Sequence, residues 1–552
     1  MAAPGLLEGH EAREAANLTK ILPPEENTYS VCEKRIPMPD GIELAADFYQ
    51  PDLSPESKPH GLIYALTPYG RSGVMALLNA KCFAARKYMV LLVSCRGTAG
   101  SGGTFVAAMH EQADSQAVVR WMREQSWYPG KFATFGPSYL GYAQWALLRE
   151  PPEDLIASVI LCSVYDHSLL TWTNGVYRTD RISWSYVTAM QDEANGRLSS
   201  AVDLRKLKAT IDATPLYDAA ERFFAGRAPY QLEFMKTPDV DDPFWARCKH
   251  RDALERVSVP LFLRSGWYDT LTVQTLAAFA RARDRGLAAY LTVGPWTHVV
   301  ACGSDAMPEV FDFLDEYVAG SAKKLSAALP VRVFVTGAEE WRSLQSWPPP
   351  AETTKERTFY LHGDKTLSEE AVPAAGAPPA LSFTYDPYNP TPTVGGPLMA
   401  RGGRVDDSAY AARDDVLVYT SAPLETDVEL LGRPAVQLAH ATDLPHADLW
   451  VRLSEVDAGD ASHNLTENWQ ALDGIGVQRR EGGTFWFALV DRAHVFKAGT
   501  RIRLIVAGGS FPLMARNPGT GVNRTLAKEL KAVTHTVQHG NGISKLILPC
   551  SI

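Results

Sequence analysis

A serine lies at the kind of turn where an α/β enzyme holds its nucleophile. The segment Phe135-Gly136-Pro137-Ser138-Tyr139-Leu140-Gly141 follows a short β-like run and opens a helix-like run. At a sharp strand-to-helix turn the serine backbone is strained and its hydroxyl points out of the end of the sheet, as in a nucleophile elbow. The usual G-x-S-x-G spacing is not met, because Leu140 occupies the second glycine position and Gly141 comes one place late. On this segment alone, a serine that caps an ordinary helix is an equal alternative.

Two later segments place an acid and a base after apolar runs. Asp269 ends the segment Ser265-Gly266-Trp267-Tyr268-Asp269, and His298 ends Gly294-Pro295-Trp296-Thr297-His298. Sites in parallel α/β sheets form at the carboxyl ends of strands, so Ser138, Asp269 and His298 should meet at one edge. Their chain order is that of α/β-hydrolase triads. Taken singly, the aspartate and the histidine are more often structural; as a set they predict a nucleophile, an orienting acid and a general base.

Hydrogen-bond donors must also face the oxyanion that forms when the serine attacks a carbonyl. The backbone N–H of Tyr139, the residue after Ser138, is one candidate. The loop Leu66-Thr67-Pro68-Tyr69-Gly70-Arg71 follows an early strand and offers the phenol of Tyr69 as the second. Judged from the loop alone, a tyrosine beside Pro and Gly more often serves packing.

Strands and helices alternate around these residues, which predicts an α/β fold with a parallel sheet covered on both faces. Between about 167 and 248 the chain is helical in pattern and rich in aromatic residues, which predicts a cap over the site. After about 329, short strands separated by Gly, Pro and Asp turns predict an all-β sandwich of jelly-roll type. The expected parts are an N-terminal arm at 1–30, an α/β-hydrolase domain at 31–166 and 249–328, a helical cap at 167–248 and a jelly roll at 329–552.

Composition excludes several other classes. The 552 residues are 46% hydrophobic and 21% charged with a net charge of -9, and no basic run suggests a nucleic-acid partner. No apolar run reaches the roughly 18 residues that span a bilayer, and no secretory signal is visible, so we expect a cytoplasmic enzyme. The seven cysteines form no C-x-x-C pair, which argues against disulfides and a metal site. The loop at 96–103 does not spell G-x-G-x-x-G, so no cofactor is expected.

The ordered set of motifs resembles the cocaine-esterase-like (CocE/NonD) serine hydrolases, which are related to X-prolyl dipeptidyl peptidases and α-amino acid ester hydrolases. The resemblance runs from about Ser30 to the C-terminus. The segments that carry it include Thr67-Pro68-Tyr69-Gly70, Arg96-Gly97, Gly136-Pro137-Ser138-Tyr139-Leu140-Gly141, Gly266-Trp267-Tyr268-Asp269, Gly294-Pro295-Trp296-Thr297-His298, Val333-Phe334-Val335-Thr336-Gly337-Ala338 and Arg413-Asp414-Asp415-Val416-Leu417-Val418-Tyr419.

The resemblance implies an α/β-hydrolase domain, a helical cap and a jelly roll, and it implies that the Tyr69 hydroxyl serves the oxyanion. The late glycine of the elbow is a feature of this family. One departure is Ser94, where the family often has an acidic residue two places before the Arg-Gly pair. The cap matches loosely. Its Trp172, Trp184 and Tyr186, together with Leu271 after the triad aspartate, are candidates for an acyl pocket, although such residues are more often core.

These observations predict a serine hydrolase without a cofactor that cleaves small-molecule esters, or amides, through an acyl-enzyme on Ser138. An acyltransferase would use the same triad. A dipeptidyl peptidase is less favoured, because no carboxylates can be identified that would bind a free amino terminus. A non-catalytic scaffold would have no need for Ser138, Asp269, His298 and Tyr69 together. Self-association into a homo-oligomer is left open by the sequence.

Overall fold

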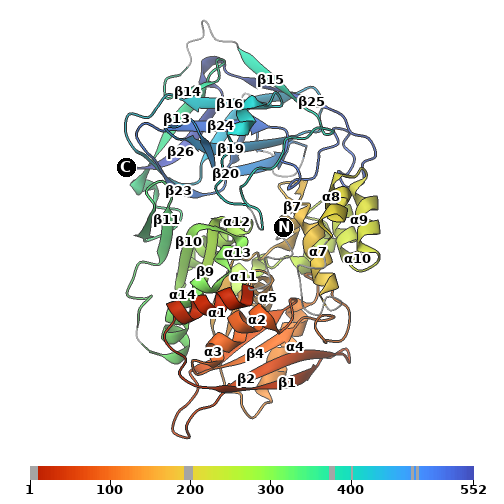
Figure 1. Ribbon diagram of the computed structural model, residues 1–552, viewed down its shortest axis with the longest axis vertical. Helices are drawn as coiled ribbons and strands as arrows, with labels where there is room; N and C mark the ends of the chain where they lie inside the picture. Colours follow the sequence, from red (N-terminus) through yellow and green to blue (C-terminus); the bar gives the residue numbers. More distant parts are fainter. Residues whose placement is uncertain are drawn as a thin grey trace.

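The fold is built on two large sheets, one in each half of the molecule (Figure 1). We describe it from a computed structural model, which describes residues 10–191, 203–321, 323–371, 379–399, 402–473, 478–479 and 484–552. The expected α/β-hydrolase fold, helical cap and all-β C-terminal part are confirmed. The N-terminal part of the expected arm, residues 1–9, lies outside the described residues, and the rest of it contains helix α1 (His10–Ile21).

The first sheet has the strand order β1-β2-β4-β3-β5-β6-β9-β10-β11-β12. From β4 to β11 neighbouring strands are parallel, whereas β1, β2 and β12 pair antiparallel. The central strands are continuous apolar runs because a parallel sheet is buried on both faces. Their bounds are β1 (Tyr29–Pro37), β2 (Glu43–Pro51), β3 (Gly61–Thr67), β4 (Tyr88–Ser94), β5 (Phe132–Pro137), β6 (Leu155–Leu161), β9 (Leu261–Tyr268), β10 (Ala289–Thr297), β11 (Val331–Val335) and β12 (Glu340–Leu344).

Helices cover both faces of this sheet, because alternate residues of its strands point into two separate apolar cores. In β3, Leu62 and Tyr64 belong to one core, whereas Ile63 and Ala65 belong to the other. Helices α4, α5 and α12 contribute to the first core, and α1, α3 and α14 to the second. The bounds are α2 (Gly73–Ala76), α3 (Cys82–Ala84), α4 (Glu111–Arg123), α5 (Tyr139–Leu147), α12 (Thr272–Asp284), α13 (His298–Ala301) and α14 (Met307–Leu314).

The cap is inserted between β6 and β9 and lies at the side of the molecule, next to the junction of its two halves (Figure 1). Aromatic residues form much of its interior, which explains the aromatic composition of this stretch. None of the helices in the described part of the chain is long and apolar enough to cross a membrane. The elements of the cap are α6 (His167–Thr171), β7 (Trp172–Thr173), β8 (Val176–Tyr177), α7 (Asp180–Met190), α8 (Leu204–Asp212), α9 (Leu216–Phe224), α10 (Pro229–Lys236) and α11 (Arg251–Arg256).

The C-terminal part is all β, as expected. In β24, Ile502, Leu504 and Val506 point into its core with the two-residue period of a strand, while Ile505 and Ala507 on the opposite face pack into a second apolar cluster. Within the described residues, 14 strands form this sheet system. They are β13 (Thr354–Leu361), β14 (Thr366–Ser368), β15 (Ala380–Tyr385), β16 (Val416–Ser421), β17 (Val428–Gly432), β18 (Ala435–Thr442), β19 (Asp448–Val456), β20 (Ser462–Ala471), β21 (Gln478–Arg479), β22 (Phe485–Ala488), β23 (Arg492–Phe496), β24 (Arg501–Ala507), β25 (Val533–Gln538) and β26 (Lys545–Ser551).

One strand joins a different sheet from the one the sequence suggests. We expected Val331–Val335, β11, to begin the jelly roll, but it pairs in parallel with β10 and extends the first sheet, followed by β12. The alternation of apolar and polar residues in β11 predicts a strand, but it does not show which sheet that strand joins.

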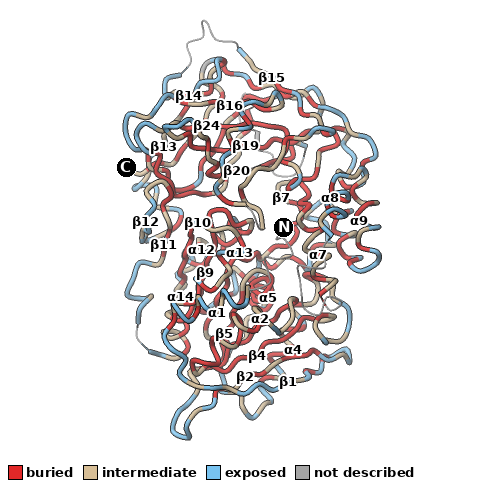
Figure 2. The backbone as a smooth tube through the Cα atoms, in the orientation of Figure 1, coloured by how far each residue is buried: buried red, intermediate tan, exposed pale blue. Residues whose placement is uncertain are grey.

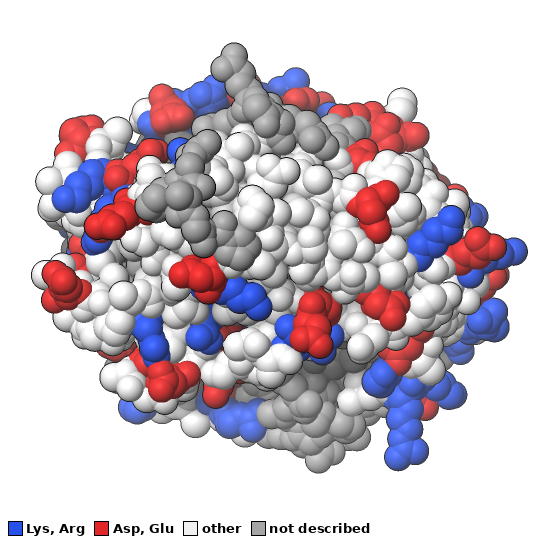
Figure 3. All heavy atoms as spheres, turned by 90° about the horizontal axis from the view of Figure 1, so that it is seen from above, with Lys and Arg blue, Asp and Glu red and all other residues white. Residues whose placement is uncertain are grey.

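The two halves are joined by direct packing. Val176 of the cap hairpin shares an apolar cluster with Tyr410 and Trp450 of the sandwich, and Figure 2 shows buried residues in the inner strands of both sheets. On the outer face of the sandwich end, basic and acidic side chains are interspersed (Figure 3), so charges of one sign build no strong field there.

The packing around Gly141 predicts what a side chain at this position of the elbow would do. A Cβ atom built on Gly141 would lie 2.5 Å from the Cβ of Ser163, which is too close for two carbon atoms. Gly141→Ala should therefore push α5 away from β6, lower the free energy of unfolding by about 1–3 kcal/mol and reduce hydrolytic activity. Thermal melting and ester hydrolysis measure the two effects. Gly540→Ala is the control, since a Cβ there meets no atom within 4 Å; equal behaviour of the two variants would contradict this reading of the elbow.

Candidate active site

Ser138 occupies a strained turn between β5 and α5. Its backbone has φ 57° and ψ -121°, a conformation that non-glycine residues rarely adopt. The turn is held by a 2.8 Å hydrogen bond from the Ser138 N–H to the carbonyl oxygen of Leu161. Gly136 is required because a Cβ there would lie 2.3 Å from the Cβ of Leu140. The Ser138 side chain caps no helical N–H, so the alternative of a simple helix-capping serine does not describe it.

The structure brings the three predicted triad residues together. Asp269 directly follows β9, and His298 directly follows β10 as the first residue of α13. His298 Nε2 lies 2.9 Å from the Oγ of Ser138, and His298 Nδ1 lies 2.9 Å from Oδ1 of Asp269. The imidazole and the carboxylate are buried, with 4% and 3% of each residue exposed, so water competes little for these hydrogen bonds. The carboxyl ends of β5, β9 and β10 thus create one continuous hydrogen-bonded chain.

Neighbouring donors keep Asp269 ionised and oriented. Ser265 donates a 2.7 Å hydrogen bond to Oδ2, and the backbone N–H of Leu271 donates a 3.0 Å hydrogen bond to Oδ1. Burial opposes the charge on this carboxylate, but His298 and the two donors together hold the pKa of Asp269 below its ordinary value. A charged Asp269 fixes which nitrogen of the imidazole carries the proton and leaves Nε2 free to face Ser138.

Two thiols adjoin the imidazole, which the sequence did not indicate. Cys302 Sγ lies 4.0 Å from His298 Nε2, and Cys162 lies in the same cluster, with the three candidate ligand atoms within 4.8 Å of one another. Burial disfavours the charged imidazole, whereas a negative charge on Cys302 and the Asp269 carboxylate favour it and raise the pKa of His298. Two thiols and an imidazole could bind a thiophilic metal. In this structure, however, Nε2 already faces Ser138, the arrangement that acyl transfer requires.

Tyr69 lies beside the nucleophile, as the loop position suggested. Its hydroxyl accepts a 3.1 Å hydrogen bond from Nε1 of Trp184 and lines the same cavity as Ser138. Burial raises the pKa of Tyr69, which keeps the phenol protonated and able to donate. The backbone N–H of Tyr139 occupies the first position of α5, where a helix offers no internal acceptor. Both predicted oxyanion donors are therefore next to Ser138.

The narrow cavity at Ser138 includes two of the four predicted pocket residues. Trp184 and Leu271 line it, whereas Trp172 and Tyr186 do not. The indole of Trp172 is buried and donates to the Phe234 carbonyl oxygen at 2.8 Å, and the ring of Tyr186 packs against Phe223. The spacing of aromatic residues in the cap sequence could not show which of their side chains face the cavity at Ser138. Besides Ser138 and Tyr69, the remaining lining residues of this cavity are Tyr139, Tyr142, Val164, His167, Leu170, Arg181 and Met399.

A larger cavity of about 280 Å³ adjoins the first one. Val164, Leu170 and Leu271 line both cavities. The larger one lies where the catalytic sheet, the cap and the sandwich meet, and its far wall includes Trp469 and Leu489 of the sandwich. A substrate at Ser138 can therefore extend toward all three parts of the protein.

Comparison with known proteins relates both parts of the chain to one group of hydrolases. A model of the X-Pro dipeptidyl-peptidase (S15) family matches residues 40–300, and a model of the X-Pro dipeptidyl-peptidase C-terminal non-catalytic domain matches residues 326–547. Over residues 40–300 the chain is similar to the S15 family of serine hydrolases. It is 26% identical over 580 residues to the cocaine esterase of Rhodococcus sp. (strain MB1 Bresler), covering 95% of this chain and 99% of that protein. The expected resemblance and the expected hydrolase class are confirmed.

Two solved structures share the fold of this chain. An aminopeptidase from the marine sediment archaeon Thaumarchaeota archaeon superposes with a TM-score of 0.79 at 21% identity, covering 96% of this chain and 98% of that one. An α-amino acid ester hydrolase superposes with a TM-score of 0.78 at 22% identity, with coverage of 96% and 98%. At these identities the likeness establishes the architecture.

Ser94 stands where the resemblance led us to expect an acidic residue, and a nearby carboxylate takes over the expected ion pair. Where an acidic residue was expected, Ser94 accepts a hydrogen bond from Arg71, the residue two places after Tyr69. The guanidinium of Arg71 pairs instead with Asp47 of β2, with a distance of 3.2 Å between Nε and Oδ1. The ion pair that steadies the Tyr69 loop is thus made with a different strand.

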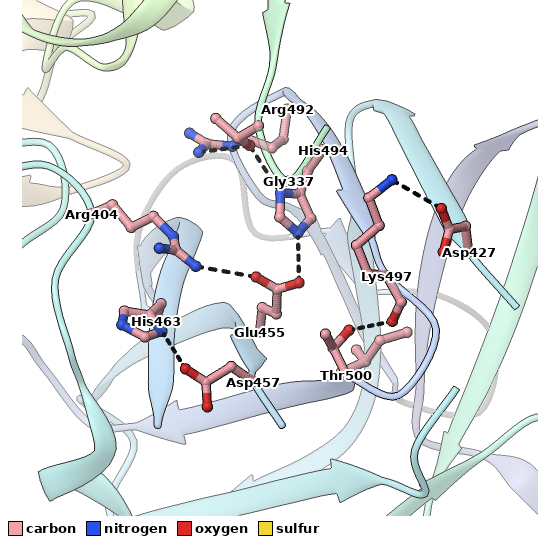
Figure 4. A network of polar contacts seen from close by, with 12 residues as sticks. Gly337, Arg404, Asp427, Glu455, Asp457, His463, Arg492, His494, Lys497 and Thr500 are labelled. Carbon is pink, nitrogen blue, oxygen red and sulfur yellow. Dashed lines mark hydrogen bonds and ion pairs between the residues drawn. The ribbon is translucent and has the colours of Figure 1, made fainter. Parts of the chain in front are cut away.

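A residue of the sandwich is hydrogen-bonded to the residue that precedes the triad aspartate. Tyr268, the residue before Asp269, receives a 2.6 Å hydrogen bond on its hydroxyl from the buried guanidinium of Arg492. Arg492 starts strand β23, which continues to His494 and the network drawn in Figure 4, where His494 faces Glu455. The C-terminal part therefore contributes to the position of Asp269 without contacting the reacting atoms.

A buried carboxyl group anchors the residue after the nucleophile. The hydroxyl of Tyr139 donates to Glu111 and accepts a 2.7 Å hydrogen bond from the backbone N–H of Ala108. Burial raises the pKa of Glu111 to about 7. Sequence reasoning missed Glu111, because its position in an amphipathic helix does not show that it faces the elbow.

The raised pKa of Glu111 predicts a pH-dependent stability. Between the ordinary value of 4.5 and about 7, the folded protein keeps a proton that the unfolded chain releases. Below pH 4.5 the protonated Glu111 makes its full contribution to the free energy of unfolding. This contribution, about 3 kcal/mol in all, is lost as the pH rises through about 7. Glu111→Gln removes this dependence, so its melting temperature should rise relative to the wild type between about pH 5 and pH 8. A constant difference across that range would contradict the assignment.

Proposed function

We propose that this protein hydrolyses carboxylic esters of small molecules through an acyl-enzyme on Ser138. The observation that carries the proposal is the unbroken hydrogen-bond chain from Ser138 through His298 to Asp269, with 2.9 Å at each step. No metal or organic cofactor takes part in this proposal. A cytoplasmic location and self-association stay predictions from the sequence.

The first half of the reaction transfers the acyl group to the enzyme. Ser138 Oγ attacks the carbonyl carbon while His298 Nε2 takes its proton. Asp269 stabilises the imidazolium that forms and holds its orientation. When the tetrahedral intermediate collapses, the bond from carbon to the alcohol oxygen breaks, and His298 returns the proton to the departing alcohol. A water molecule then repeats the sequence on the acyl-enzyme, which releases the acid and restores Ser138.

The oxyanion of the intermediate would be held by the Tyr69 hydroxyl and the Tyr139 backbone N–H. The Tyr69 oxygen accepts from Trp184, so its own proton can point toward the reacting carbonyl. The indole of Trp184 is in turn stacked on the ring of Tyr139, with ring centroids 5.5 Å apart. The cap thereby contributes a group that orients the oxyanion donor before substrate arrives, which is what lowers the barrier in such sites.

The charges of the cavity favour an ester hydrolase over an aminopeptidase. An enzyme that trims peptides from a free amino terminus must bind an ammonium group, for which a carboxylate is the natural partner. Among the described residues, the cavity at Ser138 is lined by no Asp or Glu, and its charged group is Arg181. Glu467 and Asp491 line the larger adjoining cavity, but each is already paired with an arginine, Arg452 and Arg433 respectively. An acyltransferase would use the same triad, and nothing in the cavity distinguishes an alcohol acceptor from water.

Removal of the nucleophile should end turnover. Ser138→Ala is expected to reduce hydrolysis of a chromogenic short-chain ester to the residual level that the oxyanion donors alone provide, a loss of at least about 10⁴-fold. Ser54→Ala, in an exposed loop, is the matched control and should keep full activity. Retained turnover in Ser138→Ala would refute the mechanism.

Removal of the phenol tests the oxyanion assignment separately. Tyr69→Phe keeps the ring but deletes the donor, so kcat should fall by about 10²–10³-fold with a smaller change in KM. Steady-state kinetics on the same ester, together with a melting curve to establish folding, give the answer. A kcat within about threefold of the wild type would assign the second donor elsewhere.

A further inference from the structure

A buried arginine with an unused donor lies in the wall of the cavity at Ser138. Arg181, on the first turn of α7, has only 3% of its surface exposed. Its Nη2 is buried and has no hydrogen-bond partner, and its side chain lines the same cavity as Ser138 and Tyr69. A buried guanidinium nitrogen without an acceptor is costly, so a group that supplies one from the cavity would be bound strongly.

The carboxylate beside Arg181 is already shared. Asp180 Oδ1 accepts from Arg181 Nε at 3.1 Å, while its Oδ2 accepts from Arg178 Nη2 at 2.6 Å. Arg178 is also buried, and its Nε is likewise without a partner. Two guanidinium groups therefore divide one carboxylate. Asp269, the other acidic group near these residues, has both oxygens engaged by Ser265, Leu271 and His298.

The pair Asp180–Arg181 also holds the guanidinium in place. The bond at Nε fixes the guanidinium along the edge that Nε shares with Nη2, and on that edge Nη2 is left without an acceptor. The guanidinium carbon lies 5.9 Å from the ring of Trp184, the residue that donates to Tyr69. A carbonyl group at Ser138 and a second acceptor near Arg181 can thus belong to one acyl chain, and a guanidinium recognises a carboxylate more strongly than a neutral oxygen.

We propose that Arg181 selects substrates whose acyl group ends in a carboxylate, so that the preferred substrates are half-esters of short dicarboxylic acids. This inference rests on the proposed acyl-enzyme at Ser138. In the acylation step Arg181 takes no part in the bond changes; it positions the acyl chain, while Ser138, His298 and the departing alcohol exchange the bonds and the proton. The apolar side chains of Val164, Leu170 and Leu271 would cover the methylene groups between the two carbonyl carbons.

The direct test compares charged and neutral acyl groups of equal length. Monoethyl succinate, glutarate and adipate are paired with ethyl butyrate, valerate and hexanoate, and kcat/KM is measured from base consumption at constant pH. The wild type should favour at least one half-ester over its neutral partner by about 10- to 100-fold, the range of a charge-assisted contact. Arg181→Gln should bring that ratio close to one, and Arg181→Lys should give an intermediate ratio. Arg281→Gln, an exposed arginine paired with Glu255, is the control and should keep the wild-type ratio.

A second measurement does not depend on turnover of these esters or on folding of the variants. Glutarate should slow the reaction of wild-type Ser138 with a fluorophosphonate at concentrations about tenfold lower than valerate does. Equal protection by the two acids, or a ratio near one for all three ester pairs, would overturn the role of Arg181 while the serine hydrolase mechanism stands. Absence of any fluorophosphonate adduct on Ser138 would instead overturn the proposed function, and this inference with it.

Discussion

The backbone at Ser138 is the constraint on which the rest of the site depends. A positive φ at a serine costs about 1–3 kcal/mol and persists only where the surroundings enforce it. Here the β5–α5 turn is held by the bond to Leu161, and Gly136 and Gly141 permit the close approach of α5 to the sheet. The strain turns the hydroxyl toward His298 instead of toward the helix N-terminus. A relaxed turn would leave the same side chain as a helix cap without a base in reach.

Each part of the molecule then contributes residues to the surroundings of that hydroxyl. The catalytic sheet supplies Asp269 and His298 from adjacent strand ends, because parallel strands place their carboxyl ends at one edge. The cap supplies Trp184, which orients Tyr69, and Arg181, which faces the cavity. The sandwich holds Tyr268 through Arg492. This division of work explains why a domain that carries no reacting atom packs so closely on the other two.

The sequence allowed the sheet, the elbow and the triad to be predicted, because these follow from local patterns read in order. Apolar runs mark the strands, and the residues after them must lie at the sheet edge. What could not be predicted depends on contacts between distant elements. Cys162 and Cys302 adjoin His298 although no local motif links them, and Glu111 reaches Tyr139 from another helix. The aromatic content of residues 167–248 predicted the cap, but it could not show which rings face the active site. Trp172 and Tyr186, which we expected in the pocket, lie outside the cavity. The pairing of β11 likewise depends on which sheet edge is free.

The central claim is that one serine, held at this turn beside His298, is an activated nucleophile. The most direct measurement is to treat the whole protein with a fluorophosphonate and to map the adduct by peptide mass spectrometry. The account predicts a single adduct on the peptide that contains Ser138, formed much more slowly in His298→Ala. An adduct on another serine, or equal labelling rates in the wild type and His298→Ala, would contradict it.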